Sequence, residues 1–110
     1  MNNYLPIFIM GAPRSGTTLL ASLLASRNDA IALPEMHYMH DLLRQEILYK
    51  YVSREKVKNA LKNHFMFREL NIVSSSRELE KIVENTILGT IKNIIEAYNK
   101  KYYNKVCKYW

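Results

Sequence analysis

The sequence Pro-Ile-Phe-Ile-Met-Gly-Ala-Pro-Arg-Ser-Gly-Thr-Thr-Leu-Leu, residues 6–20, decides the fold prediction. Its first five residues form an apolar run without polar alternation, which is typical of a short strand buried on both faces of a parallel sheet. Gly11 and Gly16 then indicate a turn. Residues 17–27 carry leucines at helical spacing, so we expect a helix with one buried face formed by Leu19, Leu20, Leu23 and Leu24.

A second short strand is expected at residues 30–33, where Pro34 ends another apolar run. Strand, glycine turn, helix and strand make a βαβ unit, which predicts an α/β fold with the first two strands close together. Residues 105–110 have the pattern of the start of a further strand. We therefore expect one domain, with a βαβ portion at 1–38, a helical segment at 39–103 and a strand beginning at 104–110.

The helical segment contains three periodic patterns. Leu43, Ile47 and Tyr51 are spaced by four, which predicts a helix after about Met39. Ser53 is a candidate N-cap for a helix that places Val57, Ala60, Leu61 and Phe65 on one side. Ser75 and Glu78 have the spacing of a capping box and open the longest pattern, Leu79 to Tyr98, with Gly89 inside it.

Composition excludes several classes of protein. The 110 residues are 48% hydrophobic and 24% charged, which is ordinary for a globular domain and excludes global disorder. The net charge of +6 favours anionic partners. A single cysteine, Cys107, forms no internal disulfide, and we find neither a signal peptide nor a transmembrane segment, so we expect a cytoplasmic protein. One Cys and three His without ligand spacing predict no metal site.

The loop at residues 11–18 has the frame G-x-x-x-x-G-x-[ST] between a strand and a helix. In such a loop, backbone N–H groups converge on an anion, and the helix N-terminus adds its positive dipole end. Nucleotide-hydrolysing loops place a lysine after the second glycine, where this chain has Thr17. The only cation in the loop is Arg14, so the pattern favours one phosphate-like group over ATPase or GTPase chemistry.

Residues 6–20 resemble the 5′-phosphosulfate-binding loop of sulfotransferases, a family with a P-loop α/β fold that uses 3′-phosphoadenosine 5′-phosphosulfate. The segment Leu33-Pro-Glu-Met-His-Tyr38 is similar to the second-strand segment of family branches in which a glutamate is the base. Lys108-Tyr-Trp110 is similar to the first residues of a further family strand. The clear resemblance covers residues 6–38.

The resemblance implies roles for named residues. The 5′-phosphate would be bound by Arg14, Ser15, Gly16, Thr17 and Thr18. Arg14 would also act in catalysis, with Glu35 as the general base and His37 as the alternative base. The reaction would transfer a sulfuryl group to a hydroxyl or amine of a small-molecule or glycan acceptor, without a metal. No nucleic-acid-binding motif is present.

The resemblance is incomplete, because the family binds the 3′-phosphate through a downstream Arg, a Ser and a Gly-rich loop that this chain lacks. The sequence therefore resembles the N-terminal part of a longer domain, and we expect the 110-residue chain alone to bind the cofactor weakly and not to turn over. Two alternatives remain open. One is a nucleotide kinase or NTPase with a degenerate loop, and the other is a non-catalytic anion-binding or interaction fragment.

Two groups of basic residues stand outside the loop. The stretch Lys50, Arg54, Lys56, Lys58 and Lys62 falls on the polar side of a helical pattern. It is interpreted as a solvated helix face, with a surface for an acidic substrate as the alternative. Lys100, Lys101, Lys105 and Lys108 have a similar interpretation, and lysines at the end of a helix also complement its dipole.

Overall fold

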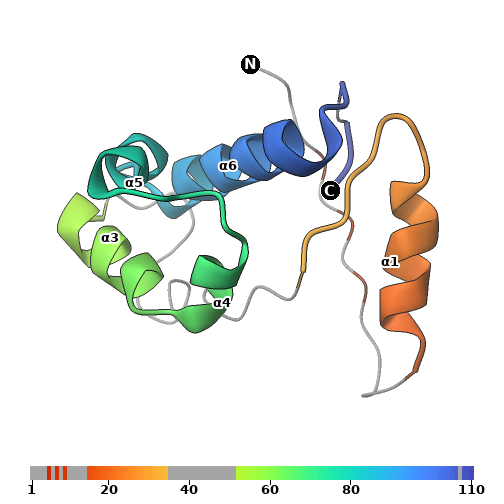
Figure 1. Ribbon diagram of the computed structural model, residues 1–110, viewed down its shortest axis with the longest axis horizontal. Helices are drawn as coiled ribbons and strands as arrows, with labels where there is room; N and C mark the ends of the chain where they lie inside the picture. Colours follow the sequence, from red (N-terminus) through yellow and green to blue (C-terminus); the bar gives the residue numbers. More distant parts are fainter. Residues whose placement is uncertain (1–4, 6, 8, 10–14, 35–51, 107) are drawn as a thin grey trace. The chain divides into compact units, whose positions relative to one another are not determined.

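The computed structural model describes Leu5, Ile7, Ile9 and residues 15–34, 52–106 and 108–110 (Figure 1). The chain divides into two compact units. Unit 1 comprises residues 1–33 and 99–110, and unit 2 comprises residues 34–98. The helix predicted after Met39 lies outside the described residues.

The first helix of unit 1 is α1, Thr17–Ala25, which begins after the N-cap residue Gly16 and closely matches the predicted helix. The prediction that its leucines form a buried face is wrong, since Leu19 is 64% and Leu23 is 60% exposed. Ala25 is the buried residue of this helix. The amphipathic spacing thus predicts the helix correctly, but it does not predict the exposure of Leu19 and Leu23.

Segment 108–110 pairs in parallel with two other segments of unit 1. Tyr109 forms isolated bridges with Leu5 and with Ala30. The N–H of Leu5 donates to the Lys108 carbonyl (2.8 Å), and the Tyr109 N–H donates to the carbonyl of Asp29 (3.0 Å). The terminal segment therefore lies between the two segments that the sequence predicts to be close neighbours.

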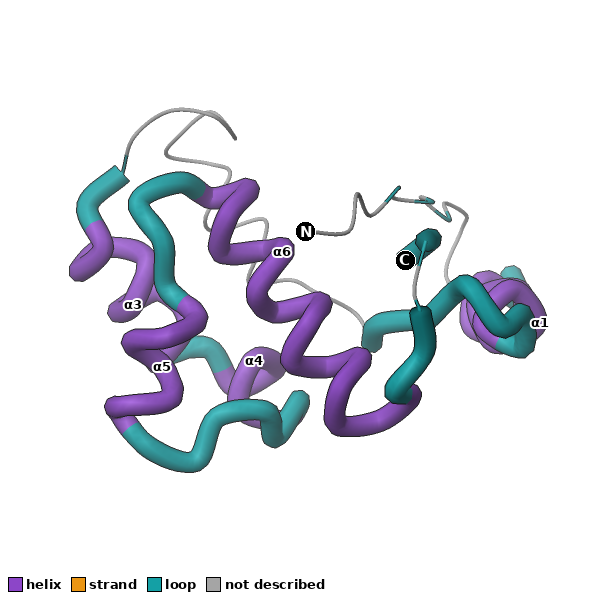
Figure 2. Tube along the Cα trace, turned by 90° about the horizontal axis from the view of Figure 1, so that it is seen from above, coloured by secondary structure: helices purple, strands orange, loops and turns teal. Residues whose placement is uncertain are grey.

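These pairs are isolated bridges, and the described residues contain no longer strand (Figure 2). Of the strand expected at residues 6–10, only Ile7 and Ile9 are described. In the strands expected at 30–33 and 105–110, the described residues form single bridged positions at Ala30 and Tyr109. The described part of the chain is mostly helical.

Unit 2 contains four described helices, α3 (Arg54–Lys62), α4 (Phe65–Glu69), α5 (Ser76–Ile82) and α6 (Ile87–Tyr98). Helix α3 packs against α4, and α5 packs against α6 (Figure 1). A short π-helical turn, η1 (Asn99–Tyr103), follows α6 and belongs to unit 1. The side chains least accessible to solvent are Val57, Leu61, Val83, Ile87, Thr90, Ile91, Ile94 and Ile95, which form the core of unit 2.

Helix α3 begins after Ser53, as predicted, but it ends at Lys62. The chain becomes extended at His64, whose side chain accepts a hydrogen bond from the Met66 N–H (3.3 Å) and caps α4. Phe65 is therefore the first residue of α4 and is 54% exposed. The prediction that Phe65 shares the apolar face of the preceding helix is wrong, because the cap at His64 starts a new helix.

Helix α5 begins with half of the predicted capping box. The Ser75 hydroxyl accepts a hydrogen bond from the Glu78 N–H (3.3 Å), which confirms the forward contact. The Glu78 carboxylate accepts from the N–H of Ser74 (2.7 Å) and from the Ser74 hydroxyl (3.0 Å). The described return contact is thus made one residue earlier than the capping-box pattern predicts.

The prediction of one continuous helix up to Tyr98 is wrong, because the chain leaves the helix at Val83 (ψ 127°) and α6 starts a new one. The Thr86 hydroxyl accepts from the Gly89 N–H (3.1 Å) and so caps α6. A Cβ at Gly89 would lie 2.9 Å from the Thr86 hydroxyl oxygen, which explains the glycine. The hydroxyl of the fully buried Thr90 donates to the Thr86 carbonyl (3.1 Å) and fixes the same turn.

Two members of the basic stretch join α3 to α5 instead of lying free in solvent. The Arg54 guanidinium donates to the carbonyls of Val83 (2.6 Å) and Glu80 (2.8 Å). Lys58 is hydrogen-bonded to the Glu80 carboxylate. Hydrogen bonding from Lys58, and then from Arg54, lowers the pKa of Glu80. For these two residues the interpretation as a purely solvated face is wrong.

Candidate functional site

The described part of the phosphate-loop motif is residues 15–18, at the N-terminal end of α1. Gly16 has φ 91° and ψ 13°, a left-handed conformation that glycine adopts without strain. Apart from its chain neighbours, no heavy atom of the described residues lies within 4 Å of the position that a Cβ on Gly16 would occupy. The backbone thus turns into the helix in a conformation that favours glycine.

The first turn of α1 has no side-chain cap at its N-cap residue and contains no acidic side chain. The first N–H groups of a helix have no partner within the helix, and together they form a site suited to an anion. Ser15 and Thr18 are exposed, and Thr17 is half-buried. Within the described residues, no hydrogen bond involves the hydroxyls of these three side chains. The end of α1 therefore offers both amide and hydroxyl donors to a ligand.

The remaining predicted site residues lie outside the described residues. Arg14 would supply the cation of the loop, and Glu35 and His37 are the two candidate bases. Their roles in the site stay predictions. The structure therefore describes the half of the predicted anion site formed by residues 15–18.

The opposite end of α1 is held by Lys105. Its ammonium group donates to the carbonyls of Ala25 (2.6 Å), Arg27 (2.9 Å) and Ala30 (3.1 Å). It also lies 4.8 Å from the centre of the Tyr103 ring, within range of a cation–π interaction. The sequence pattern predicted only a solvated lysine at a helix end, because nothing in the spacing shows that three carbonyls converge at this point.

The loop that contains residue 105 is itself fixed by Asn99, which is 8% exposed. The Asn99 amide donates to the Lys105 carbonyl (2.8 Å) and accepts from the Lys105 N–H (3.1 Å). Asn104 has φ 55° and reverses the chain after η1. The last described helical turn, η1, thus ends at Tyr103.

An ion pair lies in the turn that follows α1. The Arg27 guanidinium contacts both carboxylate oxygens of Asp29, at 2.9 and 3.0 Å. This hydrogen bonding lowers the pKa of Asp29 and raises the pKa of Arg27. Arg27 and Lys108 lie 5.4 and 5.5 Å from the centre of the Tyr109 ring. The charged side chains therefore support the bridged segments of unit 1.

Comparison with known protein families shows to which family the chain belongs. Residues 6–109 match the model of the sulfotransferase family, which is nearly the whole chain. The chain belongs to the sulfotransferase family. The match extends well beyond the segment 6–38 that carries the clear resemblance, and it includes the helical region and the bridged segment near Tyr109. Comparisons with curated proteins and with solved structures gave no match.

In residues 15–34, 52–106 and 108–110, no helix combines the length and apolar character needed to span a membrane. The same described residues include no group of three or more His, Cys, Asp or Glu side chains that could hold a metal ion.

Proposed function

We propose that this sulfotransferase-family chain forms the donor-binding half of a sulfuryl-transfer site in an α/β P-loop fold. The donor would be 3′-phosphoadenosine 5′-phosphosulfate, and the acceptor a hydroxyl or amine of a small molecule or glycan. The family match over residues 6–109 is the observation that carries this proposal. The left-handed Gly16 and the donor groups at the start of α1 agree with it.

In this proposal the N–H groups at the start of α1 hold the 5′-phosphate, assisted by the hydroxyls of Ser15, Thr17 and Thr18. Negative charge builds up on the 5′-phosphate when the sulfur–oxygen bond breaks. Fixed donors stabilise that charge with little reorganisation. Arg14 would add a charge-assisted contact to the same group. The chain binds and orients the donor, and the activated sulfuryl group is supplied by the donor itself.

Glu35 is proposed as the general base that takes the proton of the acceptor during attack. A glutamate is ionised at neutral pH, because its ordinary pKa is about 4.3. General-base assistance typically contributes about 10²–10⁴ in rate. In a protein that carries this segment and transfers sulfate, Glu35→Gln should lower kcat by that factor and leave donor affinity nearly unchanged. Full kcat in Glu35→Gln, with loss of activity in His37→Ala, would assign the base to His37.

Donor binding is tested by calorimetric titration with adenosine 3′,5′-bisphosphate, the desulfated product of the donor. We expect Arg14→Ala to weaken binding about tenfold or more, since a hydrogen bond to a charged group contributes about 1.5–3 kcal/mol. Thr18→Ala should have a smaller effect, because its hydroxyl is a neutral donor. Equal affinities of the wild type and Arg14→Ala would reject the assignment.

Matched controls separate the site from general effects of charge or helix stability. Arg77→Ala removes an exposed arginine of unit 2, and Ser22→Ala removes an exposed hydroxyl from the middle of α1. Neither change should alter affinity for the bisphosphate. The kinase or NTPase alternative predicts tighter binding of magnesium–ATP than of the bisphosphate. The non-catalytic alternative predicts binding without transfer in every form of the protein.

A further inference from the structure

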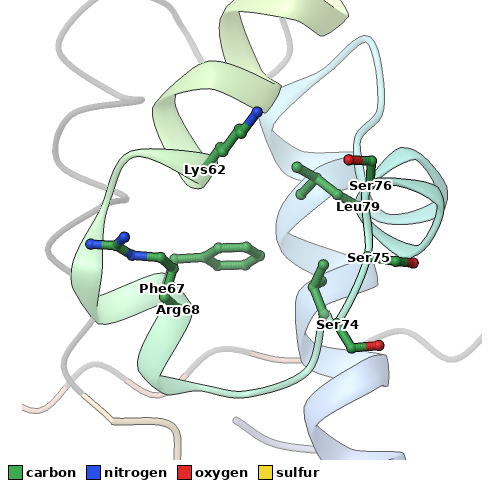
Figure 3. Close-up of a pocket in the computed structure, with 8 residues that line it drawn as sticks. Lys62, Phe67, Arg68, Ser74, Ser75, Ser76 and Leu79 are labelled. Carbon is green, nitrogen blue, oxygen red and sulfur yellow. The ribbon is translucent and has the colours of Figure 1, made fainter.

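Unit 2 contains a pocket of about 400 Å³ between α4 and the start of α5 (Figure 3). This volume lies in the range of small-molecule sites in proteins. Every described lining residue belongs to unit 2. Residues 15–18, the described part of the phosphate-loop motif, are not among them.

The interior of the pocket is apolar. Phe67 is 4% and Leu79 is 5% exposed, and their side chains point toward one another across the pocket (Figure 3). Val73 adds a third apolar wall. An apolar ring that lies against Val73 and the accessible edges of Phe67 and Leu79 is partly removed from water, which favours binding in proportion to the apolar area covered.

The charge around this apolar interior is positive. Lys62 and Arg68 line the pocket, and its described lining residues include no carboxylate. Within the described residues, neither of these two cations takes part in an ion pair. Figure 3 shows the Lys62 side chain extending toward the Leu79 side of the pocket, whereas the Arg68 guanidinium points away from it. Lys62 is therefore the better placed cation for a ligand.

The polar side chains at the far end of the pocket are already engaged. Ser74 donates its N–H and its hydroxyl to the Glu78 carboxylate, and the Ser75 hydroxyl accepts from the Glu78 N–H. The Glu78 carboxylate brings negative charge to the Ser74 end, which lies across the pocket from Lys62 in Figure 3. An anionic group is thus favoured at the Lys62 end, and an uncharged ring is favoured in the middle.

We propose that this pocket binds a small organic anion, an aromatic or alicyclic ring with one sulfate, sulfonate or carboxylate group. The ring lies against Val73 and the accessible edges of Phe67 and Leu79, and the anionic group contacts Lys62. The described lining residues differ from those of the proposed donor site, and neither proposal depends on the other.

The test is a titration of the ¹⁵N-labelled 110-residue chain with 1-naphthalenesulfonate, followed by the amide resonances. We expect shifts in the amides of residues 67–68 and 73–79, with a dissociation constant of the order of 1 mM or tighter for a ligand of this size. Neutral 1-naphthalenemethanol and inorganic sulfate should each bind several-fold more weakly, because each supplies only one of the two interactions. Shifts confined to the exposed leucines of α1 would overturn the proposal.

Substitutions locate the anionic group. Lys62→Gln should weaken naphthalenesulfonate binding about two- to fivefold, the usual effect of one exposed ion pair, and binding should weaken further with added salt. Lys56→Gln, an exposed lysine of α3 that does not line the pocket, should leave the affinity unchanged. Arg68→Gln should have a smaller effect than Lys62→Gln. Equal affinities of Lys62→Gln and the wild type would refute the assignment of the anion to Lys62.

Discussion

Replacing Lys105 by methionine should destabilise unit 1 more than any other single lysine substitution in residues 99–110. Methionine keeps most of the apolar stem but removes the three donors. The bonds to Ala25 and Ala30 are partly buried, and the bond to Arg27 is exposed. Counting about 1.5 kcal/mol for each partly buried bond to a charged donor, and little for the exposed one, gives a loss of about 3 kcal/mol. That is a large share of the 5–15 kcal/mol that stabilises a typical domain.

Urea unfolding followed by Trp110 fluorescence measures this loss. Trp110 is the only tryptophan of the chain, and its N–H donates to the Leu5 carbonyl (3.2 Å), so its emission reports on unit 1. With a urea dependence of about 1–3 kcal/mol per molar, a loss of about 3 kcal/mol lowers the midpoint by about 1–3 M. Far-ultraviolet circular dichroism records the helices of both units in the same samples.

Lys100→Met is the matched control, since Lys100 is exposed in the same region and makes none of these contacts. Its free energy of unfolding should stay within about 0.5 kcal/mol of the wild type. Lys105→Arg should restore only part of the stability, because a planar guanidinium fork cannot aim donors at three converging carbonyls as an ammonium does. If Lys105→Met lowers the midpoint no more than Lys100→Met, the three bonds do not stabilise unit 1 and the reasoning is refuted.

Three further predictions concern unit 2. Gly89→Ala should destabilise the chain by about 1 kcal/mol in urea unfolding, because the new methyl displaces the capping hydroxyl of Thr86. This loss should outweigh the better helix propensity of alanine. In a Thr86→Ala background the same substitution should cost less. Thr90→Val keeps the shape of the side chain but removes a buried hydroxyl that makes two hydrogen bonds, so it should lower the free energy of unfolding by about 1–3 kcal/mol. An unchanged urea midpoint would show that this hydroxyl does not stabilise unit 2. The pKa of Glu80 is lowered in the folded chain. The contribution of Glu80 to stability is therefore present above its unfolded pKa and is lost as the pH falls through its folded pKa. A carboxyl NMR titration should show that Lys58→Met raises the folded pKa of Glu80, and an unchanged pKa would exclude the Lys58–Glu80 pair as the cause.

Local signals in the sequence predicted the helix starts well. Gly16 and the leucines after it identify α1, because a glycine turn and a repeating apolar spacing act within a few residues of one another. Ser53 and Ser75 both occupy their predicted N-cap positions, and the Ser75 hydroxyl accepts a capping hydrogen bond, whereas Ser53 forms no side-chain cap. These features depend on backbone groups near in sequence, which the residue types report directly.

Features set by tertiary contacts could not be predicted. The apolar periodicity continues through Val83, but the chain leaves the helix there and α6 is started by the cap at Thr86. The leucine spacing of α1 shows that one face is apolar, but it does not show what covers that face. The sequence does not distinguish Lys105 from its neighbouring lysines, because the three carbonyls that accept its hydrogen bonds belong to a turn far away in the sequence.

In the candidate site, too, local features could be predicted from the sequence, whereas features that depend on tertiary contacts could not. The glycine in the left-handed region at position 16 agrees with the motif, since that conformation is a local property of the turn. The roles of Arg14 and Glu35 depend on how separate segments meet around a ligand, and they stay predictions. The pocket of unit 2 had no sequence signal, because its residues come from three helices and the loop between α4 and α5.

The position of segment 108–110 between Leu5 and Ala30 sets an order of events during folding. The two early segments of unit 1 have no described pairing with each other, and both pair with residues 108–110. Unit 2 lies entirely between these partners in the sequence, and bonds such as Arg54 to Val83 and Glu84 to Thr90 join its own elements. Bringing the two ends of a long flexible loop together costs conformational entropy. If unit 2 folds first, the flexible chain between the pairing segments of unit 1 is shorter and this cost is smaller. On the ribosome, unit 2 can therefore fold before residues 108–110 are synthesised and can pair with the start of the chain. Variants that slow the folding of unit 2 should prolong the exposure of the apolar segment after Leu5.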